Sequence, residues 1–196
     1  MPVLGWVGFG AAMLFLAYVI YAVIRNYLIP RFSALFRGFR LSPKLRELDR
    51  SKFLFVKKLR LDKKCIDCVI VSNYGVFVIK MKDIRGVIEK ASGREGSVVR
   101  YKGSTRFYRD DEKESLKDIE RIKELSPLMR EVKFHPMLVF PDQTEVRLES
   151  ADFCGNIKDM LAFVESRCTE ENAVSNTVKT EIFEILQKKK ENIKVQ

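Results

Sequence analysis

The sequence has little of what hydrolases and nucleotide-dependent enzymes usually carry. It holds one histidine, His135, which stands before a proline at the start of an apolar stretch and is expected to be structural. No serine or cysteine occurs in a recognisable nucleophile setting, so triad chemistry has little support. A glycine-rich phosphate loop is also missing. These absences disfavour triad hydrolases and enzymes that bind nucleotides through a phosphate loop.

Cysteines are few, and their spacing gives little support to a metal site. Cys65 and Cys68 have the C-x-x-C spacing of zinc ligands, but the run CIDCVIV is typical of a strand. In a strand, a separation of three places the two sulfur atoms on opposite faces. No second pair with zinc spacing follows. We therefore expect no metal at the cysteines and four reduced thiols, including Cys154 and Cys168, as in a cytoplasmic compartment.

Acidic residues are in the minority, with 26 Asp and Glu against 36 Lys and Arg and a formal net charge of +10. This balance favours an anionic partner, either nucleic acid or an anionic membrane surface. A solvated basic surface without a partner is the alternative. The length of 196 residues leaves room for one ordinary domain and an appendage.

Charge is missing altogether from residues 3–24. As a helix these residues would span about 33 Å, enough for a hydrocarbon core of roughly 30 Å. A cleaved signal peptide is disfavoured because the positively charged start and the A-x-A cleavage site are absent and the apolar run is too long. The sequence therefore predicts a transmembrane helix within residues 1–29.

The charges that flank this stretch predict its orientation. No acidic residue occurs between it and Glu47, and four arginines follow it: Arg25, Arg31, Arg37 and Arg40. By the positive-inside rule, the N-terminus lies outside and the rest of the chain is cytoplasmic, as in a single-pass protein of the cell (inner) membrane. Residues 30–44 interleave arginine with aromatic residues, which suits contact with anionic lipids. A plain linker is the alternative for that segment.

After residue 44 the pattern becomes that of a mixed α/β domain. Strands are predicted over 52–61, 65–71, 75–82 and 133–140, with shorter strands between 96 and 108. A helix is predicted to begin at Ser115, with Asp118 in a variant of the capping box. Its apolar stripe comprises Leu116, Ile119, Ile122 and Leu125.

Two further helices are predicted over 156–167 and 176–190. The order of these elements indicates an α/β (α+β) fold with a mixed central sheet flanked by helices. The domain is expected to cover residues 45–165, followed by a C-terminal helix and basic tail over 166–196.

Lys80 and Lys82 share one face of the predicted strand 75–82, because side chains two apart point the same way. A two-residue turn at Asn73 and Tyr74 would place Asp67 of the preceding strand opposite Lys80, whereas a three-residue turn would not. A carboxylate facing two such positions is the skeleton of a metal-dependent nuclease site. That site needs two carboxylates for Mg²⁺ and a lysine for the phosphate or the attacking water.

The run CIDCVIVSNYGVFVIKMKDIRG, residues 65–86, resembles the core of the nuclease-related domain, NERD. The pattern of that family is I-D-x-V-V-V-x-x-x-G-[IV]-F-V-I-E-x-K-x-x-x-G, and its fold is similar to that of PD-(D/E)xK nucleases. The resemblance covers about residues 45–165. It implies that Asp67 would bind the metal and that Lys82 would be the catalytic lysine.

The sequence departs from the family pattern at two places. The motif glutamate falls on Lys80, and the N-P-x-x-Q segment before the helix reads as residues 109–113, without its glutamine. At about 4 Å and an effective dielectric constant near 20, a lysine repels Mg²⁺ by roughly 8 kcal/mol before screening. Activity would therefore need a relocated carboxylate, for which Glu47 is a better candidate than Asp83, which points to the other face.

Two functions remain open from the sequence. The domain could have a degenerate metal site, with Asp67 and Lys80 forming a structural ion pair, and act as a nucleic-acid-binding module or as a scaffold for a protein partner. Alternatively it is a nuclease that uses Mg²⁺, its only expected cofactor. Residues 80–109 hold nine basic and three acidic residues. The candidates for phosphate contact within this segment are Lys80, Lys82, Arg85, Arg94 and Arg106.

Overall fold

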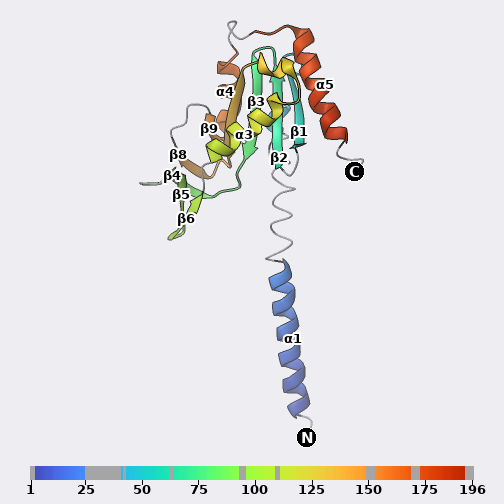
Figure 1. The fold of residues 1–196 in the computed structure, drawn as a ribbon. Coiled ribbons are helices and arrows are strands. Elements are labelled where there is room, and N and C mark those ends of the chain that lie inside the picture. Colours follow the sequence, from blue (N-terminus) through green and yellow to red (C-terminus); the bar gives the residue numbers. More distant parts are fainter. Residues whose placement is uncertain are drawn as a thin grey trace.

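A computed structural model describes residues 3–24, 41, 43–61, 64–92, 96–108, 111–148, 153–168 and 173–192. Its strands form two sheets (Figure 1). The larger sheet has the strand order β1-β2-β3-β7-β9, with β1 at Phe53–Leu61, β2 at Lys64–Ser72, β3 at Gly75–Met81, β7 at Phe134–Phe140 and β9 at Phe153–Asn156. The smaller sheet has the order β6-β5-β4-β8, with β6 at Ser104–Tyr108, β5 at Ser97–Tyr101, β4 at Gly86–Lys90 and β8 at Thr144–Arg147.

The larger sheet is mixed, as the sequence predicts. β2 runs antiparallel to both β1 and β3, whereas β7 lies parallel to both β3 and β9. The β2–β3 hairpin has the predicted two-residue turn, since Ser72 pairs with Gly75. Gly75 has a φ of +139°, and a Cβ there would lie 2.8 Å from the carbonyl oxygen of Lys133. Glycine is therefore required where the hairpin meets the start of β7.

Helices cover both faces of the larger sheet, which explains why β2 and β3 are apolar on both sides. On one face α3, at Asp111–Lys123, and α5, at Asn176–Asn192, pack against Val76 and Val78. On the other face α4, at Ile157–Ser166, packs against Phe77 and Ile79 together with Leu41, Leu45 and Leu48. A short 3₁₀ turn at Pro127–Arg130 lies between α3 and β7.

Helix α3 differs from the prediction at its start and on its buried face. It begins at Asp111, so Ser115 is not the cap but lies a full turn inside the helix. Leu116 was predicted to face the core but is 48% exposed. Ile119 and Ile122 are buried as predicted, and Ser115 and Asp118 are buried with them. These positions follow the i, i+3, i+4, i+7 spacing of one helix face, so polar residues occupy the N-terminal half of that face.

The smaller sheet was only partly predicted. The sequence indicates β5 and β6, but it does not indicate β4, β8 or β9, which have only four or five residues each. Among the described residues, the core under the smaller sheet comprises four buried side chains: Ile84, Ile88, Val99 and Phe140. Strands this short carry too little alternation to be recognised before their partners are known.

An N-terminal helix, α1, spans Val3–Val23 and stands apart from the sheets in Figure 1. From Met13 to Ile24, large apolar side chains all round the helix are 39–75% exposed. Within the described part of the chain, no helix has both the length and the apolar character needed to cross a membrane. The transmembrane helix predicted within residues 1–29 is therefore not supported, and the four flanking arginines lie outside the described residues.

Candidate functional site

A cluster of charged side chains lies between β3 and α3, where the resemblance to nucleases predicts the metal. Strand alternation places Lys80 on the same face as Val76 and Val78, which is the face that α3 covers. The amino group of Lys80 lies 2.9 Å from Glu114 Oε2 and 3.3 Å from Asp118 Oδ2. Only 14% of the Lys80 side chain is exposed. This lysine therefore occupies a mostly buried position between two carboxylates.

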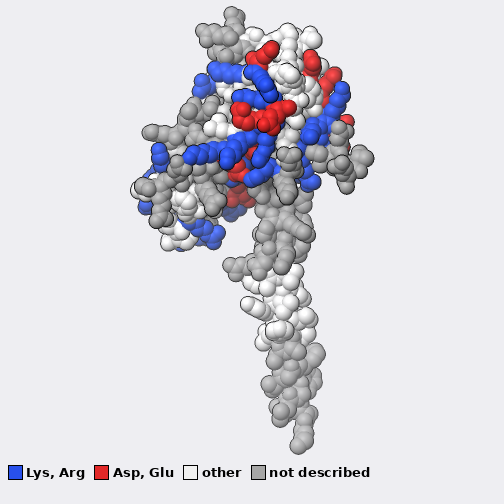
Figure 2. Space-filling view, viewed as in Figure 1, with Lys and Arg blue, Asp and Glu red and all other residues white. Residues whose placement is uncertain are grey.

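Two further cations complete the cluster. Lys64 at the start of β2 contacts the second oxygen of Glu114, and Arg121 Nη1 lies 3.0 Å from Asp118 Oδ1. Hydrogen bonds from Lys64 and Lys80 lower the pKa of Glu114 to about 2. Figure 2 shows the result at the position of α3, where acidic side chains are flanked by basic ones. The carboxylates of this cluster are thus already neutralised by the protein's own cations.

Asp67 lies on the same face of β2 as Val69 and Val71, but it has a different role from the predicted one. Its Oδ2 accepts a hydrogen bond of 2.7 Å from the backbone N–H of Met81. The paired register of β2 and β3 runs from Ser72–Gly75 to Cys68–Ile79. The Asp67 side chain therefore takes over as acceptor just past the last backbone pair of the hairpin.

The predicted ion pair between Asp67 and Lys80 is corrected by this geometry. The two-residue turn and the register agree with the prediction, but the ion pairs of Lys80 among the described residues are with Glu114 and Asp118. Lys80 is a long side chain that can reach across to a helix packed on the sheet, which a register argument within one hairpin does not consider.

Other predicted site residues are spread over the molecule. Lys82 is half-buried, and its backbone N–H donates to the Val139 carbonyl oxygen. Glu47 is exposed and pairs with Lys44 at 3.1 Å, and its segment packs on the face of the sheet opposite to α3. Asp83 is exposed at the end of β3. Neither of these acidic residues belongs to the cluster around Lys80.

The remaining phosphate-contact candidates lie around the smaller sheet. Arg85 is exposed in the connection between β3 and β4, and Arg106 is exposed on β6. Arg94 lies outside the described residues. Lys80, in contrast, is held by the carboxylates of α3. The structure therefore separates the candidates into one lysine with acidic partners and two arginines on a different sheet.

The cysteines behave as the strand pattern predicts. Cys65 is exposed and Cys68 is buried, in agreement with opposite faces of β2. Burial raises the pKa of the Cys68 thiol to about 12. None of the four cysteines forms a disulfide. In the part of the chain that the structure describes, no three His, Cys, Asp or Glu side chains are grouped so that they could hold a metal ion.

Comparison with known families decides which family the chain belongs to. The family model described as "Nuclease-related domain", NERD, matches residues 37–141, which is more than half of the chain. The chain belongs to the nuclease-related domain family. No curated protein and no solved structure matches it significantly. The NERD match includes β1 to β7 and α3, and therefore contains every residue of the Lys80 cluster.

Sequence reasoning missed Glu114 and Asp118 as members of this site. The signal that could have revealed them is their spacing, because residues at i and i+4 lie on one face of a helix. Asp118 also directly precedes Ile119, and a carboxylate beside a buried isoleucine on the inner face of a helix needs a cation as a partner. Lys80 is the basic residue of β3 that points to this face.

Proposed function

We propose that this NERD domain is catalytically inactive and binds nucleic acid without cleaving it. The observation that carries the proposal is the position of Lys80, which replaces the family's glutamate and contacts Glu114 and Asp118. A positive charge between two carboxylates performs the electrostatic role that a bound cation would perform. Asp67, the remaining carboxylate of the motif, accepts a backbone hydrogen bond from Met81.

Binding of Mg²⁺ beside Lys80 is electrostatically unfavourable. With two charges on the ion and one on the lysine, the repulsion at about 4 Å is roughly 8 kcal/mol at an effective dielectric constant near 20. Moving Lys80 away would leave Asp118, whose side chain is 4% exposed, with Arg121 as its remaining ion-pair partner in the described cluster. Binding of a metal ion at this position is therefore opposed in two ways: Lys80 repels the ion, and displacing Lys80 breaks its ion pair with the buried Asp118.

A basic surface suited to phosphate lies away from this cluster. Residues 80–109 hold nine basic and three acidic residues, and Figure 2 shows basic side chains near β5 and β6, at the lower left of the view. Neither Arg85 nor Arg106 has an ion pair within the described residues. Basic side chains without acidic partners are the ones that release counterions when they meet a phosphate backbone.

The test is a comparison of the full chain with its Lys80→Glu variant. The wild-type protein is expected to show no Mg²⁺- or Mn²⁺-dependent cleavage of plasmid or single-stranded substrates, and no heat of Mg²⁺ binding in calorimetry. Lys80→Glu would place a third carboxylate beside Glu114 and Asp118. We expect the variant to melt at a lower temperature without metal and to recover with Mg²⁺, because the ion replaces the missing positive charge.

Lys123→Glu is the matched control. It reverses the charge of a lysine on α3 that pairs with Glu120 and lies outside the Lys80 cluster. This variant should show no rescue by Mg²⁺. Wild-type cleavage that depends on metal, and that Asp67→Ala abolishes, would overturn the proposal of an inactive site.

One observation favours the alternative of an active nuclease. Glu114 and Asp118 both approach the position of the missing motif glutamate, so α3 offers relocated carboxylates if Lys80 moves. In that case wild-type cleavage should need Asp118 as well as Asp67. Loss of cleavage in Asp118→Asn, with folding retained, would support the alternative. If the protein neither cleaves nor binds nucleic acid at low salt, a scaffold role for a protein partner replaces both.

We also propose that residues 1–29, of which α1 is only the described part, attach the domain to the cell (inner) membrane as a single pass, with the N-terminus outside and the domain in the cytoplasm. The support is the exposed apolar surface from Met13 to Ile24 and the arginines at 25, 31, 37 and 40, which suit anionic lipids. A reporter fused after Gln196 should be active only in a form that works in the cytoplasm. Release of the protein from membranes by alkaline carbonate would contradict the proposal.

A further inference from the structure

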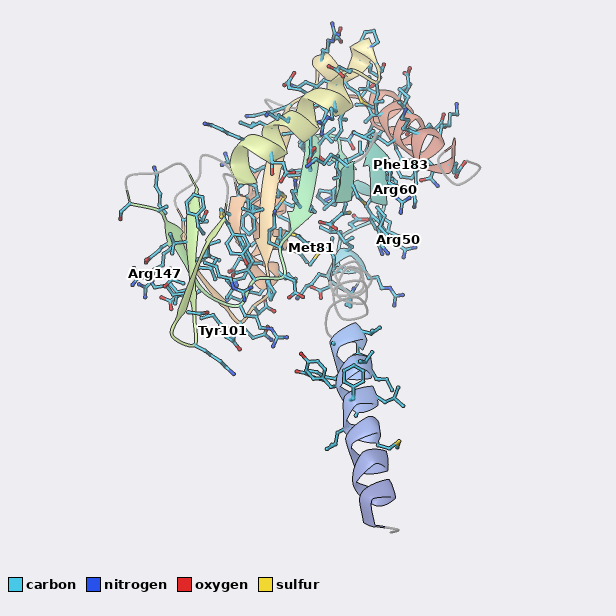
Figure 3. All side chains as sticks on the ribbon, turned by 60° about the horizontal axis from the view of Figure 1, so that its bottom comes forward. Arg50, Arg60, Met81, Tyr101, Arg147 and Phe183 are labelled. Carbon is cyan, nitrogen blue, oxygen red and sulfur yellow. The ribbon has the colours of Figure 1, made fainter. Side chains whose placement is uncertain are left out.

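A pocket of about 380 Å³ lies at the smaller sheet, away from the Lys80 cluster. It is lined by Arg85 and Gly86 from the β3–β4 connection and the start of β4, Tyr101 from the end of β5, and Gln143 from the turn between β7 and β8. Figure 3 labels Tyr101 and Arg147 on the smaller sheet. The described lining residues therefore come from three separate segments of the chain.

Two further cations lie beside Tyr101: Arg106, which the strand register places there, and Lys102, whose amino group lies near the ring. Arg106 pairs with Val99, and Ser104 pairs with Tyr101, so Arg106 and Tyr101 point to the same face of the β5–β6 hairpin. The amino group of Lys102 lies 5.5 Å from the centre of the Tyr101 ring. The ring itself remains 41% exposed. An accessible aromatic ring is thus surrounded by basic side chains.

Gly86 allows the pocket to form. Its φ is +108°, and a Cβ at this position would lie 2.2 Å from the Arg100 carbonyl oxygen and 3.0 Å from Tyr101 Cβ. Any other residue would push the β5–β6 hairpin away from the start of β4. The absence of a side chain at Gly86 therefore keeps Tyr101 close to Arg85.

The charges at the pocket favour an anion. None of the lining residues that the structure describes is acidic. The acidic residue of β4, Glu89, is three residues from Gly86 and therefore points to the opposite face of the sheet, where it forms an ion pair of 2.7 Å with Arg100. Arg85 and Arg106 have no ion pair within the residues that the structure describes. The positive charges of Arg85 and Arg106 can therefore contact an anion at the pocket, whereas the charge of Arg100 on the opposite face is balanced by Glu89.

We propose that this pocket binds one nucleotide unit of a single-stranded nucleic acid, an inference that rests on the proposed nucleic-acid-binding function. A base stacks on Tyr101, Arg85 and Arg106 contact the phosphates, and the Gln143 amide donates to or accepts from the base edge. Aromatic rings with nearby cations bind single strands because every base has a face for stacking. Bases in a duplex are already stacked, so the pocket discriminates against double strands.

The experiment measures fluorescence anisotropy of the full chain in mild detergent with a labelled single-stranded oligothymidylate and a duplex of the same length. Tyr101→Ala should weaken single-strand binding roughly 5- to 100-fold, while Tyr101→Phe, which keeps the ring, should stay within about twofold. Phe107→Ala is the matched control, because Phe107 is similarly exposed on the same hairpin but pairs with Val98 and so points to the opposite face. The Phe107→Ala variant should bind the single strand with the same affinity as the wild type.

The outcomes separate this inference from the proposed function. Wild-type binding that is equally strong in Tyr101→Ala and in Phe107→Ala would overturn the pocket while leaving nucleic-acid binding intact. A duplex bound as tightly as the single strand would also overturn it. No binding to either oligonucleotide at low salt would overturn both proposals. A competition arm with free thymidine monophosphate identifies the source of the nucleotide, since displacement at micromolar concentration would assign the pocket to a free nucleotide instead.

Discussion

In the larger sheet the charged groups that face α3 are in contact with opposite charges, whereas in the smaller sheet the basic groups at the pocket are not. Lys80 contacts two carboxylates, and Glu114 and Asp118 each contact two cations. Arg85 and Arg106 have no ion pair in the described part of the chain. Charge in the larger sheet therefore contributes to the fold, and charge in the smaller sheet is available for a ligand.

The two regions also differ in the depth of their cores. Among the described residues, each face of the larger sheet has fourteen buried side chains in its cluster, whereas the smaller sheet has four. The family motif thus lies in the part of the domain with the larger cores, where one charged residue contacts several others. The smaller sheet can vary in sequence with less effect on the fold, as is usual for regions that carry binding specificity.

The largest expected effect is on stability and tests the difference between the cores. Ile70 and Ile88 are both fully buried, the first in the larger sheet and the second in the smaller. Ile70→Ala should lower the free energy of unfolding by about 4 kcal/mol, and Ile88→Ala by about 2 kcal/mol, since the smaller cluster can relax around the cavity. Urea denaturation of both variants measures the difference. Equal losses would contradict the comparison of the two cores.

The next effect concerns Lys80 itself. Lys80→Met keeps the unbranched apolar stem of the side chain and removes the amino group, which leaves Asp118 with one cation fewer in a buried position. We expect a loss of about 2–3 kcal/mol in the free energy of unfolding, less than for a fully unpaired buried charge because Arg121 remains in contact. The matched change Lys123→Met, at an exposed ion pair, should cost less than about 1 kcal/mol. A neutral effect of Lys80→Met would show that the cluster does not stabilise the fold.

A smaller effect follows from the lowered pKa of Glu114. Its pKa is about 2 in the folded protein against 4.5 ordinarily, so the contribution to stability is complete above pH 4.5 and is lost as the pH falls towards 2. Glu114→Gln should therefore lower stability at pH 7 by about 1–2 kcal/mol, after allowing for solvent screening at a partly exposed side chain. Below about pH 2 the two proteins should have equal stability. Thermal melts between pH 2 and 7 measure this difference.

The smallest effect on stability, and the clearest on binding, is expected at the smaller sheet. Arg85→Ala combined with Arg106→Ala should change the free energy of unfolding by less than about 0.5 kcal/mol, because neither side chain is buried. Each lost phosphate contact should make the slope of log K against log[salt] shallower by about 0.7 for a single strand. Binding measured from 50 to 300 mM salt gives the slope. An unchanged slope would remove these arginines from the interface.

Much of the fold follows from local patterns in the sequence. The apolar runs at 52–61, 65–71, 75–82 and 133–140 predict β1, β2, β3 and β7, and their ends agree to within two residues. The two-residue turn fixes the register of the β2–β3 hairpin. The short strands β4, β8 and β9 could not be predicted in this way, because each has only four or five residues and because β8 and β9 pair with strands that do not adjoin them in the sequence.

The sequence by itself determined the family, the hairpin and the face of β3 from which Lys80 projects, since strand alternation and turn length are properties of neighbouring residues. Tertiary structure decided the partners of Lys80. Those partners lie on α3, 34 and 38 residues further along the chain. The rotation of α3 buries Ser115 and Asp118 and exposes Leu116, because a helix docks according to everything on the facing sheet, including a lysine that needs carboxylates. The ion pairs between Lys80 and these carboxylates become apparent only when α3 is packed against β3.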